Sequence, residues 1–497
     1  MVEVLKMTKN LNFLDLSVIR KHFKNRKIGL CHGSFDLIHL GHLNHFKEAK
    51  KISDILVVSI TSEKFINKGE GRPYNNDYKR IEFLKHLEYI DYVYLENSAS
   101  ATKIIQKLKP NFYFKGIDYE KKDLIGNLKM EKQALKKIKG KLIITKSKKL
   151  SSTKIYQKNY SNLKEEQIKQ INLISNKYGI TKIREKLIRL RKKEITLIGE
   201  PIIDKYNFCR ILGLTSKDPS ISSIVNYSKS FTGGILSNAI TASKFVKKVN
   251  LITYGQKKHF VKLKKYKNIN VVNISPLKEI QIKTRFINEN RFEKLFQTSN
   301  FQFNEFSNKE QNKILNILKK QKSSLIICDY GIGMFRDKIL SLINKIKQKK
   351  YINVQINSTN MGINLFTKYN NYHYMCLDEK EWKMGLHKQK ISNDDIIKYL
   401  DNKKTNFSFT KGKRGSFLYL KEKKFNSPAY ASKIIDVTGC GDVYFILSCL
   451  LIENEVEGEL IVFLANLYAA MYSKFIANSN EIDLEKFLLY IRQLIGD

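Results

Sequence analysis

Short apolar runs alternate with amphipathic runs over residues 27–155, and this rhythm constrains the fold more than any other feature of the sequence. The segments "KIGLCHGSF" and "DILVVSI" have the length and composition of buried strands. The segments "HLNHFKEAKKI" and "DYKRIEFLKHL", which lie between and after them, have the period of amphipathic helices. The alternation therefore predicts an open parallel sheet with helices on both faces.

A second α/β pattern begins at "EITLIGEPIID", which opens at residue 194, and runs toward the C-terminus. Within it, "SIVNYSKSF" and "EIQIKTRFINENRFEKLFQ" are predicted to be extra strands of a small lid sheet. The highly charged stretch between the two patterns has a weak helical period and indicates a helical linker. We therefore expect a first domain over residues 25–157, a linker over 158–193 and a second domain over 194–497.

Composition narrows the classes of function. The net charge is +43, but the lysines are spread along the whole chain of 497 residues, which argues against a dedicated nucleic-acid site and favours an anionic, phosphate-bearing substrate. No apolar run has the length of a membrane span and no secretory signal is evident, so a cytoplasmic location without membrane attachment is expected. The six cysteines form no CxxC pair, so no disulfide framework or zinc knuckle is predicted.

Three histidines lie in the segment "LCHGSFDLIHLGHLNHF" (residues 30–46), directly after an apolar strand. If a helix begins near Leu40, its first turn carries His39 and His42 on one side, beside backbone N–H groups that favour anions. From this segment alone, a packing role for the two histidines is about as expected as an anion-binding role. A metal site is not favoured, because the HxxxH spacing with a nearby carboxylate is absent. His45, on the next turn, is interpreted as a packing or surface residue.

The segment "GSFDLIHLGH" resembles the GxFDxxHxGH signature of the cytidylyltransferase-like nucleotidyltransferases. The segments "INKGEGRPYNNDYKRIEFL", "YFKGIDY" and "LSSTKIY" resemble further motifs of that family in the expected order. The resemblance implies a Rossmann-like domain in which a phosphate oxygen of the acceptor attacks the α-phosphorus of a nucleoside triphosphate. It also implies Mg²⁺ on the triphosphate (ATP or CTP) and release of pyrophosphate.

By this resemblance, His39 and His42 hold the triphosphate and stabilise the α-phosphorus as pyrophosphate leaves. The other residues that it assigns to the nucleotide and acceptor pocket are Ser34, Phe35, Lys51, Arg72, Arg80, Lys115, Gly116, Asp118, Tyr119, Ser151, Ser152 and Thr153. Lys50 is an alternative to Lys51 as the lysine that neutralises phosphate charge. The last motif departs from the family pattern, because Lys149 replaces a glycine and a lysine near Lys146 replaces an arginine. A lysine supplies a positive charge but cannot donate two parallel hydrogen bonds as an arginine can. Phosphate binding is therefore expected to survive this change better than selectivity for the base.

A second candidate site lies in "DVTGCGDVYFILSCLL" (residues 436–451), where glycines flank Cys440 and Asp442 precedes an apolar run. Such a turn at a helix N-terminus directs backbone N–H groups into one concavity and can bind an anion. A carboxylate at its edge can take a proton from an attacking hydroxyl. Taken alone, an ordinary turn is equally expected.

The context of this turn resembles the ribokinase-like (PfkB) sugar kinases. "DVTGCGD" is similar to their DTGAGD motif, "FTGGILSNAI" to their GGxxxN motif and "GEPIIDKY" to their opening strand, while "CDYGIGMF" resembles a segment of the heptose-phosphate kinases. The resemblance implies that Asp442 is the general base and that Gly439, Cys440 and Gly441 form the anion hole. It assigns the sugar phosphate to Asp204, Gly233, Gly234, Asn238 and Arg285, and the nucleotide and metal region to Asp378, Glu381, Lys411 and Gly412. No protein-ligated metal ion is assigned.

Several positions depart from the kinase pattern. Glu200 replaces the aspartate of the first strand, "VQIN" with Asn357 replaces a DPK segment, and Asp378 replaces the asparagine of an NxxE motif. Ile332 replaces a lysine. The base and the anion hole survive, so kinase activity is expected, with a shifted sugar specificity or a decayed kinase as alternatives.

The two domains together resemble the bifunctional family that joins a heptose 7-phosphate kinase to a heptose 1-phosphate adenylyltransferase, in reversed order. That resemblance implies anomeric phosphorylation of a sugar phosphate by ATP, then AMP transfer to a sugar 1-phosphate, giving a nucleotide sugar such as ADP-heptose for lipopolysaccharide. The expected partners are a nucleoside triphosphate and a sugar phosphate, and a homodimer is allowed but not required. The alternative is an active nucleotidyltransferase, using CTP or ATP and another phosphorylated acceptor, with a non-catalytic kinase-like domain.

Overall fold

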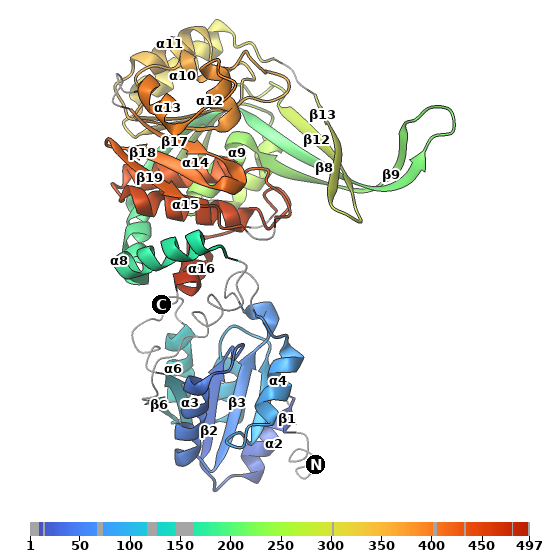
Figure 1. Cartoon of the computed structure of the whole chain (residues 1–497), viewed down its shortest axis with the longest axis vertical. Coiled ribbons are helices and arrows are strands. Elements are labelled where there is room, and N and C mark those ends of the chain that lie inside the picture. Colours follow the sequence, from blue (N-terminus) through green and yellow to red (C-terminus); the bar gives the residue numbers. More distant parts are fainter. Residues whose placement is uncertain are drawn as a thin grey trace. The chain divides into compact units, whose positions relative to one another are not determined.

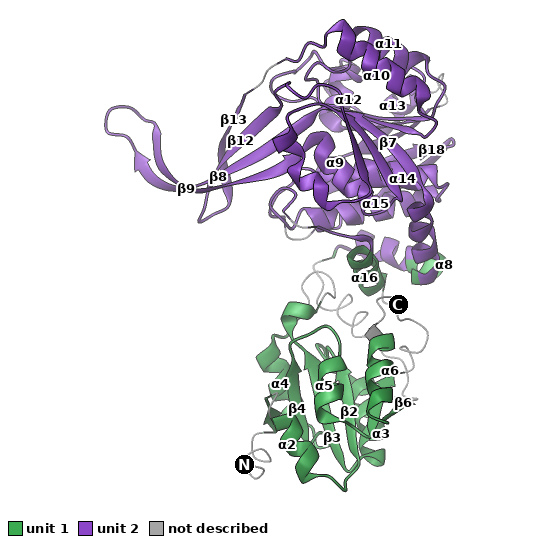
Figure 2. Ribbon diagram, turned by 180° about the vertical axis from the view of Figure 1, so that it is seen from behind, with its two compact units in different colours: residues 1–163, 175–180, 485–497 green, residues 164–174, 181–484 purple. Residues whose placement is uncertain are grey.

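The computed structural model describes residues 9–12, 15–66, 73–116, 127–145, 163–300, 303–400, 405–431, 434–479 and 481–495. The chain divides into two compact units, one of residues 1–163, 175–180 and 485–497 and the other of residues 164–174 and 181–484 (Figure 2). Both are α/β units, as the sequence predicts. No helix among the described residues combines the length and the apolar character needed to cross a membrane.

The first unit contains a parallel sheet of six strands within the described residues, in the order β1-β4-β3-β2-β5-β6. These strands are β1 (Asn10–Leu11), β2 (Ile28–Gly33), β3 (Ile55–Thr61), β4 (Tyr92–Glu96), β5 (Phe112–Gly116) and β6 (Lys141–Thr145). The chain runs from β2 toward one edge and then from β5 toward the other. The strand order therefore reverses between β2 and β5, where open α/β sheets bind ligands at the carboxyl ends of their strands.

Helices cover both faces of this sheet, as predicted. They are α2 (Asp15–His22), α3 (Leu40–Ile52), α4 (Asp77–Lys85), α5 (Thr102–Leu108) and α6 (Asn127–Lys137). One buried cluster joins the sheet to α2, α5 and α6, and a second joins it to α3 and α4. Because the strands are buried on both faces, β2 and β3 are almost continuously apolar and do not alternate.

The second unit contains a sheet of nine strands within the described residues, in the order β11-β10-β7-β14-β15-β16-β17-β18-β19. The strands from β11 to β17 in this order are parallel, and β18 and β19 are antiparallel additions. Their bounds are β7 (Glu194–Gly199), β10 (Lys248–Thr253), β11 (Ile269–Asn273), β14 (Leu325–Asp329), β15 (Lys350–Val354), β16 (Tyr374–Asp378), β17 (Asn406–Thr410), β18 (Ser416–Leu420) and β19 (Lys423–Ser427). Here the strand order reverses between β7 and β14.

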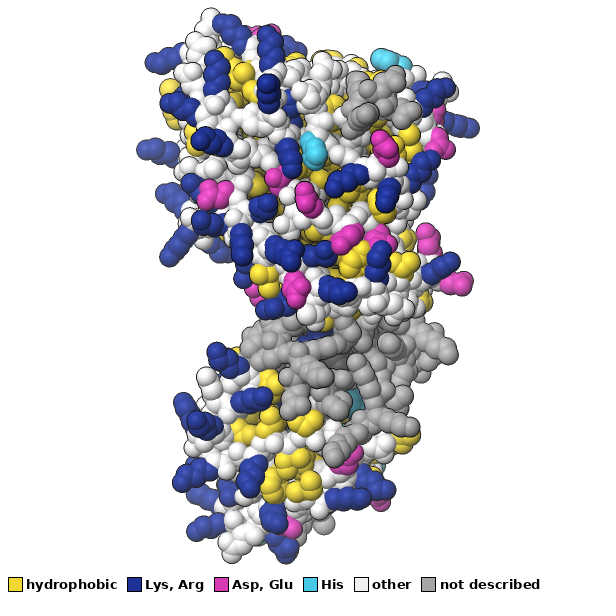
Figure 3. Space-filling view, turned by 90° about the vertical axis from the view of Figure 1, so that its left-hand side faces the viewer, with side chains coloured by type: hydrophobic (Ala, Val, Ile, Leu, Met, Phe, Trp, Pro, Cys, Tyr) yellow, Lys and Arg dark blue, Asp and Glu magenta, His cyan; other side chains and the backbone are white. Residues whose placement is uncertain are grey.

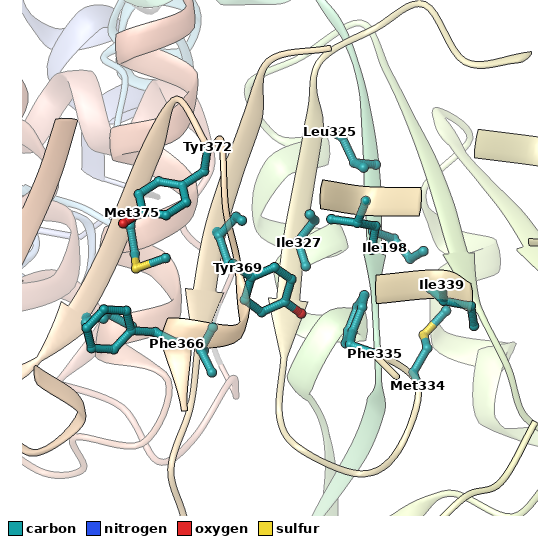
Figure 4. Close-up of a cluster of buried hydrophobic side chains, with 14 of the residues drawn as sticks. Ile198, Leu325, Ile327, Met334, Phe335, Ile339, Phe366, Tyr369, Tyr372 and Met375 are labelled. Carbon is teal, nitrogen blue, oxygen red and sulfur yellow. The ribbon is translucent and has the colours of Figure 1, made fainter. Parts of the chain in front are cut away.

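Two layers of helices enclose the second sheet (Figure 1). On one face lie α10 (Asn308–Lys320), α11 (Asp337–Lys345), α12 (Glu379–Gly385) and α13 (Asn393–Leu400), and on the other α9 (Gly234–Ser243), α14 (Cys440–Glu453) and α15 (Gly458–Tyr472). Between the first layer and the sheet lies a large buried cluster, in which Ile198, Ile327 and Met375 of the strands meet Phe335 and Phe366 (Figure 4). This packing fixes the strand ends that carry the candidate site.

A four-stranded lid sheet belongs to the same unit, with the order β13-β12-β8-β9. Its strands are β8 (Pro201–Leu214), β9 (Ile221–Gly233), β12 (Gln281–Asn288) and β13 (Glu293–Ser299), and they include both segments predicted to form a lid. The distal parts of β8 and β9 form a long ribbon that extends away from the nine-stranded sheet (Figure 1). The lid is continuous with the core, because β8 begins directly after Glu200 at the end of β7.

Two further helices complete the described chain, α8 (Glu165–Arg189) within the predicted linker and α16 (Leu484–Ile495) near the C-terminus. Gly179 interrupts α8 with a positive φ of 59° and divides it into two helical segments. Lysine and arginine side chains are scattered over the face shown in Figure 3, with aspartate and glutamate among them. That distribution matches the even spread of lysines along the sequence.

Candidate active sites

The first candidate site is the turn between β2 and α3. His39 is the N-cap residue of α3, and the His42 N–H donates to the His39 carbonyl at 2.8 Å. The two imidazole rings stack with their centroids 3.9 Å apart and their planes 17° from parallel. The structure thus brings His39 and His42 together at a helix N-terminus, beside the point where the strand order reverses.

The residues before the histidines give this turn its shape. Phe35 has a positive φ of 40°, and its ring packs against Phe46 and, edge-on, against His42. Gly33 leaves room for this ring, because a Cβ atom at residue 33 would lie only 3.1 Å from it. The buried Asp36 accepts the N–H groups of Tyr74 and Asn75 at 2.9 and 2.8 Å. Asp36 therefore ties the following loop to the histidine turn, a role that sequence reasoning missed although the residue lies inside the motif.

The neighbouring strand β5 ends in Lys115 and Gly116, whose predicted role in the pocket stays a prediction. Lys115 is buried, and its ammonium lies 3.4 Å from the Glu131 carboxylate. Burial, together with the charge of Lys115, lowers the pKa of His45 to about 4. His45 is therefore neutral near pH 7, and its Nδ1 lies 2.7 Å from the Thr145 hydroxyl. This environment is that of a packed scaffold residue.

Two residues assigned to this pocket by resemblance lie in other surroundings. Arg80 is buried, and its guanidinium donates to the carbonyls of Ser34 and Thr61 at 2.6 and 2.9 Å and forms an ion pair with Asp77. This arrangement suits a clamp on the loops better than a substrate contact. Lys51 lies in the last turn of α3, about 13 Å along the helix axis from His42 at 1.5 Å per residue. The structure does not bring Lys51 to the histidines.

Lys50, the alternative to Lys51, donates to the Asp91 carboxylate at 2.6 Å and lies about 12 Å along the helix axis from His42. The remaining residues assigned to this pocket lie outside the described residues. They are Arg72, Asp118, Tyr119, Ser151, Ser152 and Thr153, together with Lys146 and Lys149. Their roles stay predictions.

The second candidate site is centred on Asp442, in the first turn of α14. The Tyr330 hydroxyl and the Gln355 side-chain amide each donate to Asp442 Oδ1 at 2.8 Å. Tyr330 follows β14 and Gln355 follows β15, so both donors come from the carboxyl ends of adjacent parallel strands. Burial raises the pKa of Asp442 to about 6, against the effect of the Tyr330 hydrogen bond. The carboxylate is thus ionised at neutral pH but far more basic than an ordinary aspartate.

The glycines before Asp442 shape the N-terminus of α14. Gly439 is the N-cap residue and has a left-handed φ of 84°, and a Cβ atom at Gly441 would meet nothing within 4 Å. The Cys440 N–H donates to the Val437 carbonyl at 3.1 Å, so this N–H closes the turn. The N–H groups of Gly441 and Asp442, in the first turn of the helix, have no partner within the helix by its geometry.

Glu200, one of the departures from the kinase pattern, is fully buried at the end of β7. One carboxylate oxygen accepts the N–H of Tyr330 at 2.8 Å, and the other accepts those of Ile332 and Met334 at 2.9 and 2.8 Å. Burial and the charge of the nearby Asp329 raise its pKa. Glu200 therefore holds the loop that carries Tyr330, and through Tyr330 it orients Asp442.

The lid sheet supplies the polar groups expected to face the sugar. Asp204 on β8 is buried and forms an ion pair with Arg285 of β12. Gly233 permits this arrangement, because a Cβ atom there would lie 2.2 Å from Asp204 Oδ2. Gly234 has a positive φ of 54°, and a Cβ atom there would lie 2.7 Å from the Glu200 carbonyl. Lys283, paired in register with Asp204, adds a half-buried lysine whose pKa is lowered by burial, and sequence reasoning missed it.

Asn238 lies fully buried in the first half of α9. Its Nδ2 donates to the Tyr330 hydroxyl at 3.0 Å and to Cys328 Sγ at 3.2 Å. Its Oδ1 is buried and has no hydrogen-bond partner among the described residues. Asn238 thus extends the chain of hydrogen bonds from Tyr330 to Asp442, and it leaves one acceptor available.

The predicted nucleotide and metal region lies at the ends of β16 and β17. Asp378 caps α12 by accepting the Glu381 N–H at 2.8 Å, and Glu381 accepts the Asp378 N–H at 2.7 Å in return. This reciprocal pair is a capping box, which gives both residues a structural role. Lys411 donates to Asn393 at 2.8 Å and lies over the Phe409 ring, and Gly412 follows it with a positive φ of 56°. The Asn357 side-chain amide donates a hydrogen bond to the Tyr330 carbonyl at 3.3 Å.

The donors to Asp442 were not predicted, although a signal existed. Glu200, Tyr330, Gln355, Asp378 and Lys411 all come directly after or at the ends of parallel strands of one sheet. Because such ends meet at one edge, polar residues there converge on the ligand site. The chain order alone does not reveal which of them touch.

The chain combines two α/β units, and each has a candidate site at the N-terminus of a helix. The cytidylyltransferase-like family matches residues 30–158, and the pfkB carbohydrate kinase family matches residues 192–472. The chain belongs to the pfkB family of carbohydrate kinases and also carries a cytidylyltransferase-like domain. The order of the two domains along the chain is as predicted.

Curated relatives of the chain include the bifunctional protein HldE of Citrifermentans bemidjiense, 35% identical over 120 residues (24% of this chain and 25% of the relative), and that of Aliarcobacter butzleri, 32% identical over 136 residues (27% and 29%). The match thus spans about a quarter of each relative's length. Among solved structures, phosphofructokinase-2 of Escherichia coli matches with a TM-score of 0.48 and 13% identity, over 61% of this chain and 99% of that chain.

Proposed function

We propose that the second unit is an active sugar kinase in which Asp442 is the general base. Asp442 accepts the proton of a sugar hydroxyl, the hydroxyl oxygen attacks the γ-phosphorus of ATP, and ADP leaves. The observation that carries this proposal is the arrangement around Asp442. A buried carboxylate with a pKa of about 6, held by Tyr330 and Gln355, stands at a helix N-terminus whose Gly441 and Asp442 N–H groups can bind the transferred phosphoryl group.

The acceptor of this kinase is a sugar phosphate, with the heptose 7-phosphate class as the candidate. Two cations, Arg285 and Lys283, lie on the lid face that carries Asp204, so this face suits a substrate that is itself anionic. Asp204 and the Oδ1 atom of Asn238 supply acceptors for sugar hydroxyls. The anomeric hydroxyl is the position that the family resemblance implies.

The first unit is proposed to be a nucleotidyltransferase that transfers AMP from ATP to the resulting sugar 1-phosphate. His39 and His42 donate hydrogen bonds to the phosphates as negative charge develops, and no protein nucleophile is required. The nucleotide sugar of such a pair of reactions is ADP-heptose or a close relative, and lipopolysaccharide is the surface glycan that would consume it. We propose that both reactions occur in the cytoplasm, where nucleoside triphosphates are available.

Magnesium is proposed to enter both sites on the nucleotide. Among the residues that the structure describes, no group of three or more His, Cys, Asp or Glu side chains is arranged to hold a metal ion. Mg²⁺ is commonly held by substrate phosphates, water and one or two carboxylates. When bound, the ion would offset charge on the phosphates.

A second candidate is a nucleotidyltransferase, with CTP or ATP, whose kinase-like unit only binds ligands. The observation that favours it is the neutral side chains of Gln355 and Asn357, where the kinase resemblance implies an acid and a lysine. The bifunctional proposal is preferred, because Gln355 donates directly to the proposed base and so has a defined place in the site.

A homodimer formed through the lid ribbon is also proposed. Strand β9 is an edge of the lid sheet, and the ribbon exposes large apolar side chains, among them Leu212, Leu214 and Ile221. An exposed apolar edge strand favours pairing with a second copy. Light scattering should give twice the chain mass, and Leu214→Lys should give the monomer. A wild-type protein that is monomeric at micromolar concentration would contradict this proposal.

The test of function is a panel assay. The protein is incubated with Mg²⁺, ATP or CTP, and individual sugar phosphates, and ADP and pyrophosphate are followed separately. The bifunctional proposal predicts ADP with a heptose 7-phosphate and pyrophosphate with a heptose 1-phosphate. Pyrophosphate without ADP for every sugar phosphate would instead support the second candidate.

A further inference from the structure

Asp436 opens the turn of residues 436–442 that carries the anion hole, which we refer to as the anion-hole turn. Its side chain is buried and accepts five hydrogen bonds. The donors are the Tyr206 hydroxyl at 2.7 Å, the Lys294 ammonium at 2.7 Å, the Thr438 N–H and hydroxyl at 3.0 and 2.8 Å, and the Ala477 N–H at 3.0 Å. Neither the proposed base nor the proposed anion hole uses this carboxylate directly.

The donors to Asp436 join the lid sheet to the anion-hole turn. Tyr206 comes from β8 and Lys294 from β13. A third lid strand, β9, is tied to the same place, because the Thr232 carbonyl accepts from the Asn478 side chain at 2.8 Å and Asn478 adjoins Ala477. Three of the four lid strands therefore meet at the base of the turn that leads to Gly439.

Lys294 is the charged member of this junction. Besides Asp436, its ammonium contacts the Thr438 hydroxyl at 3.0 Å, so it bonds two residues of the turn from the lid. Burial alone would raise the pKa of Asp436, but the hydrogen bonds from Lys294 and Tyr206 hold it well below its usual range. The Lys294 side chain itself is 41% exposed. It can therefore be replaced with little effect on the core.

We propose that Lys294 is a positioning residue for phosphoryl transfer, which holds the anion-hole turn in place from the lid. The inference rests on the proposed kinase function for its catalytic consequence. Without the ammonium, Asp436 is a buried carboxylate that has lost its cation, and the turn can relax toward water to solvate it. A small displacement there redirects the Gly441 and Asp442 N–H groups, and misplacement of this kind lowers the rate of a positioned reaction.

The alternative is that Lys294 only stabilises the fold. A stabilising residue would change the unfolding temperature and leave the kinetics of the folded enzyme intact. A positioning residue would lower kcat while the KM values for ATP and sugar phosphate change little, because the donors act on the transferred group in the transition state.

The experiment compares three variants of the full chain with the wild type. Lys294→Gln removes the charge, and Lys294→Arg keeps it. Lys229→Gln is the matched control, because Lys229 is a lid lysine on β9 that lies over the Tyr227 ring and not at Asp436. Initial rates of ADP formation give kcat and KM, and hydrogen exchange measured without substrates reports on the amides of residues 436–443.

We expect Lys294→Gln to lower kcat about tenfold or more, with KM changed less than kcat, and to speed exchange in the anion-hole turn. Lys294→Arg should restore both, and Lys229→Gln should match the wild type. Unchanged kcat and unchanged exchange in Lys294→Gln would overturn the inference.

A wild type that forms no ADP would refute the proposed kinase function, and hydrogen exchange would still decide whether Lys294 holds the turn. If Lys294→Gln does not fold, Thr438→Ala, which removes the second contact of Lys294, is measured by the same two readouts and judged by the same outcomes.

Discussion

At the scale of single residues, the proposed kinase activity of the second unit depends most on Asp442. An aspartate in water is a weak base, because its pKa lies near 4. Burial raises the pKa of Asp442 to about 6 against the opposing effect of the Tyr330 hydrogen bond, while two hydrogen bonds to Oδ1 fix its orientation. The residue is thus deprotonated at neutral pH and well placed to accept a proton.

The pH dependence of ADP formation should report this ionisation. Asp442 must be deprotonated to act as a base, so kcat/KM should rise with pH and level off above an inflection near 6. Below that pH the carboxyl group is protonated, and the rate should fall tenfold per pH unit. Initial rates between pH 4.5 and 8.5 measure the profile. A flat profile across this range would contradict the assignment of Asp442 as the base.

The pH of this inflection should depend on Gln355. Its side-chain amide lies 2.8 Å from Asp442 Oδ1, so Gln355→Glu places a second carboxylate beside the base. A like charge at this distance favours the protonated form, and the inflection should move upward by roughly one unit or more. Gln389→Glu, at an exposed glutamine, is the control and should leave the profile unchanged. An inflection that stays in place in Gln355→Glu would show that the contact is absent in solution.

At the scale of elements, the sequence predicts the strands better than it predicts the contacts at their ends. Apolar runs such as β14 and β15 are nearly continuous, because parallel strands are buried on both faces, and this pattern is local. The lid strands could also be predicted from their local sequence, and the structure places His39 and His42 together as expected, while the role of Asp442 as a base stays a proposal. The partners of Asp442 lie 112 and 87 residues away in the chain, so no local pattern reveals them. Arg80 is assigned to the pocket by its motif, but its side chain donates to the backbone carbonyls of Ser34 and Thr61. A sequence motif does not reveal such contacts.

The stability of the loop after β14 should depend on Glu200. Its carboxylate accepts three backbone N–H groups, and the side-chain amide of Gln would direct an N–H group toward at least one of them. Glu200→Gln should therefore lower the free energy of unfolding by about 1–3 kcal/mol. Glu194→Gln, at the exposed start of the same strand, should change it by less than about 0.5 kcal/mol. Calorimetry of both variants checks this, and equal unfolding temperatures would contradict the role of Glu200.

At the scale of the whole molecule, the chain carries two candidate sites, each built within its own unit. The histidine turn lies at the strand-order reversal of the six-stranded sheet, and Asp442 lies at the edge where the parallel strands of the nine-stranded sheet end. The two proposed activities should therefore be separable by single substitutions, even though the reactions are consecutive steps on one sugar.

The most direct test of this account is the effect of Asp442→Asn and His42→Ala on the two products. With ATP, Mg²⁺ and the appropriate sugar phosphate for each reaction, Asp442→Asn should lower ADP formation by at least about 100-fold and leave pyrophosphate release at the wild-type rate. His42→Ala should do the reverse. Loss of both activities in either folded variant, or full ADP formation by Asp442→Asn, would contradict the assignment of two independent sites.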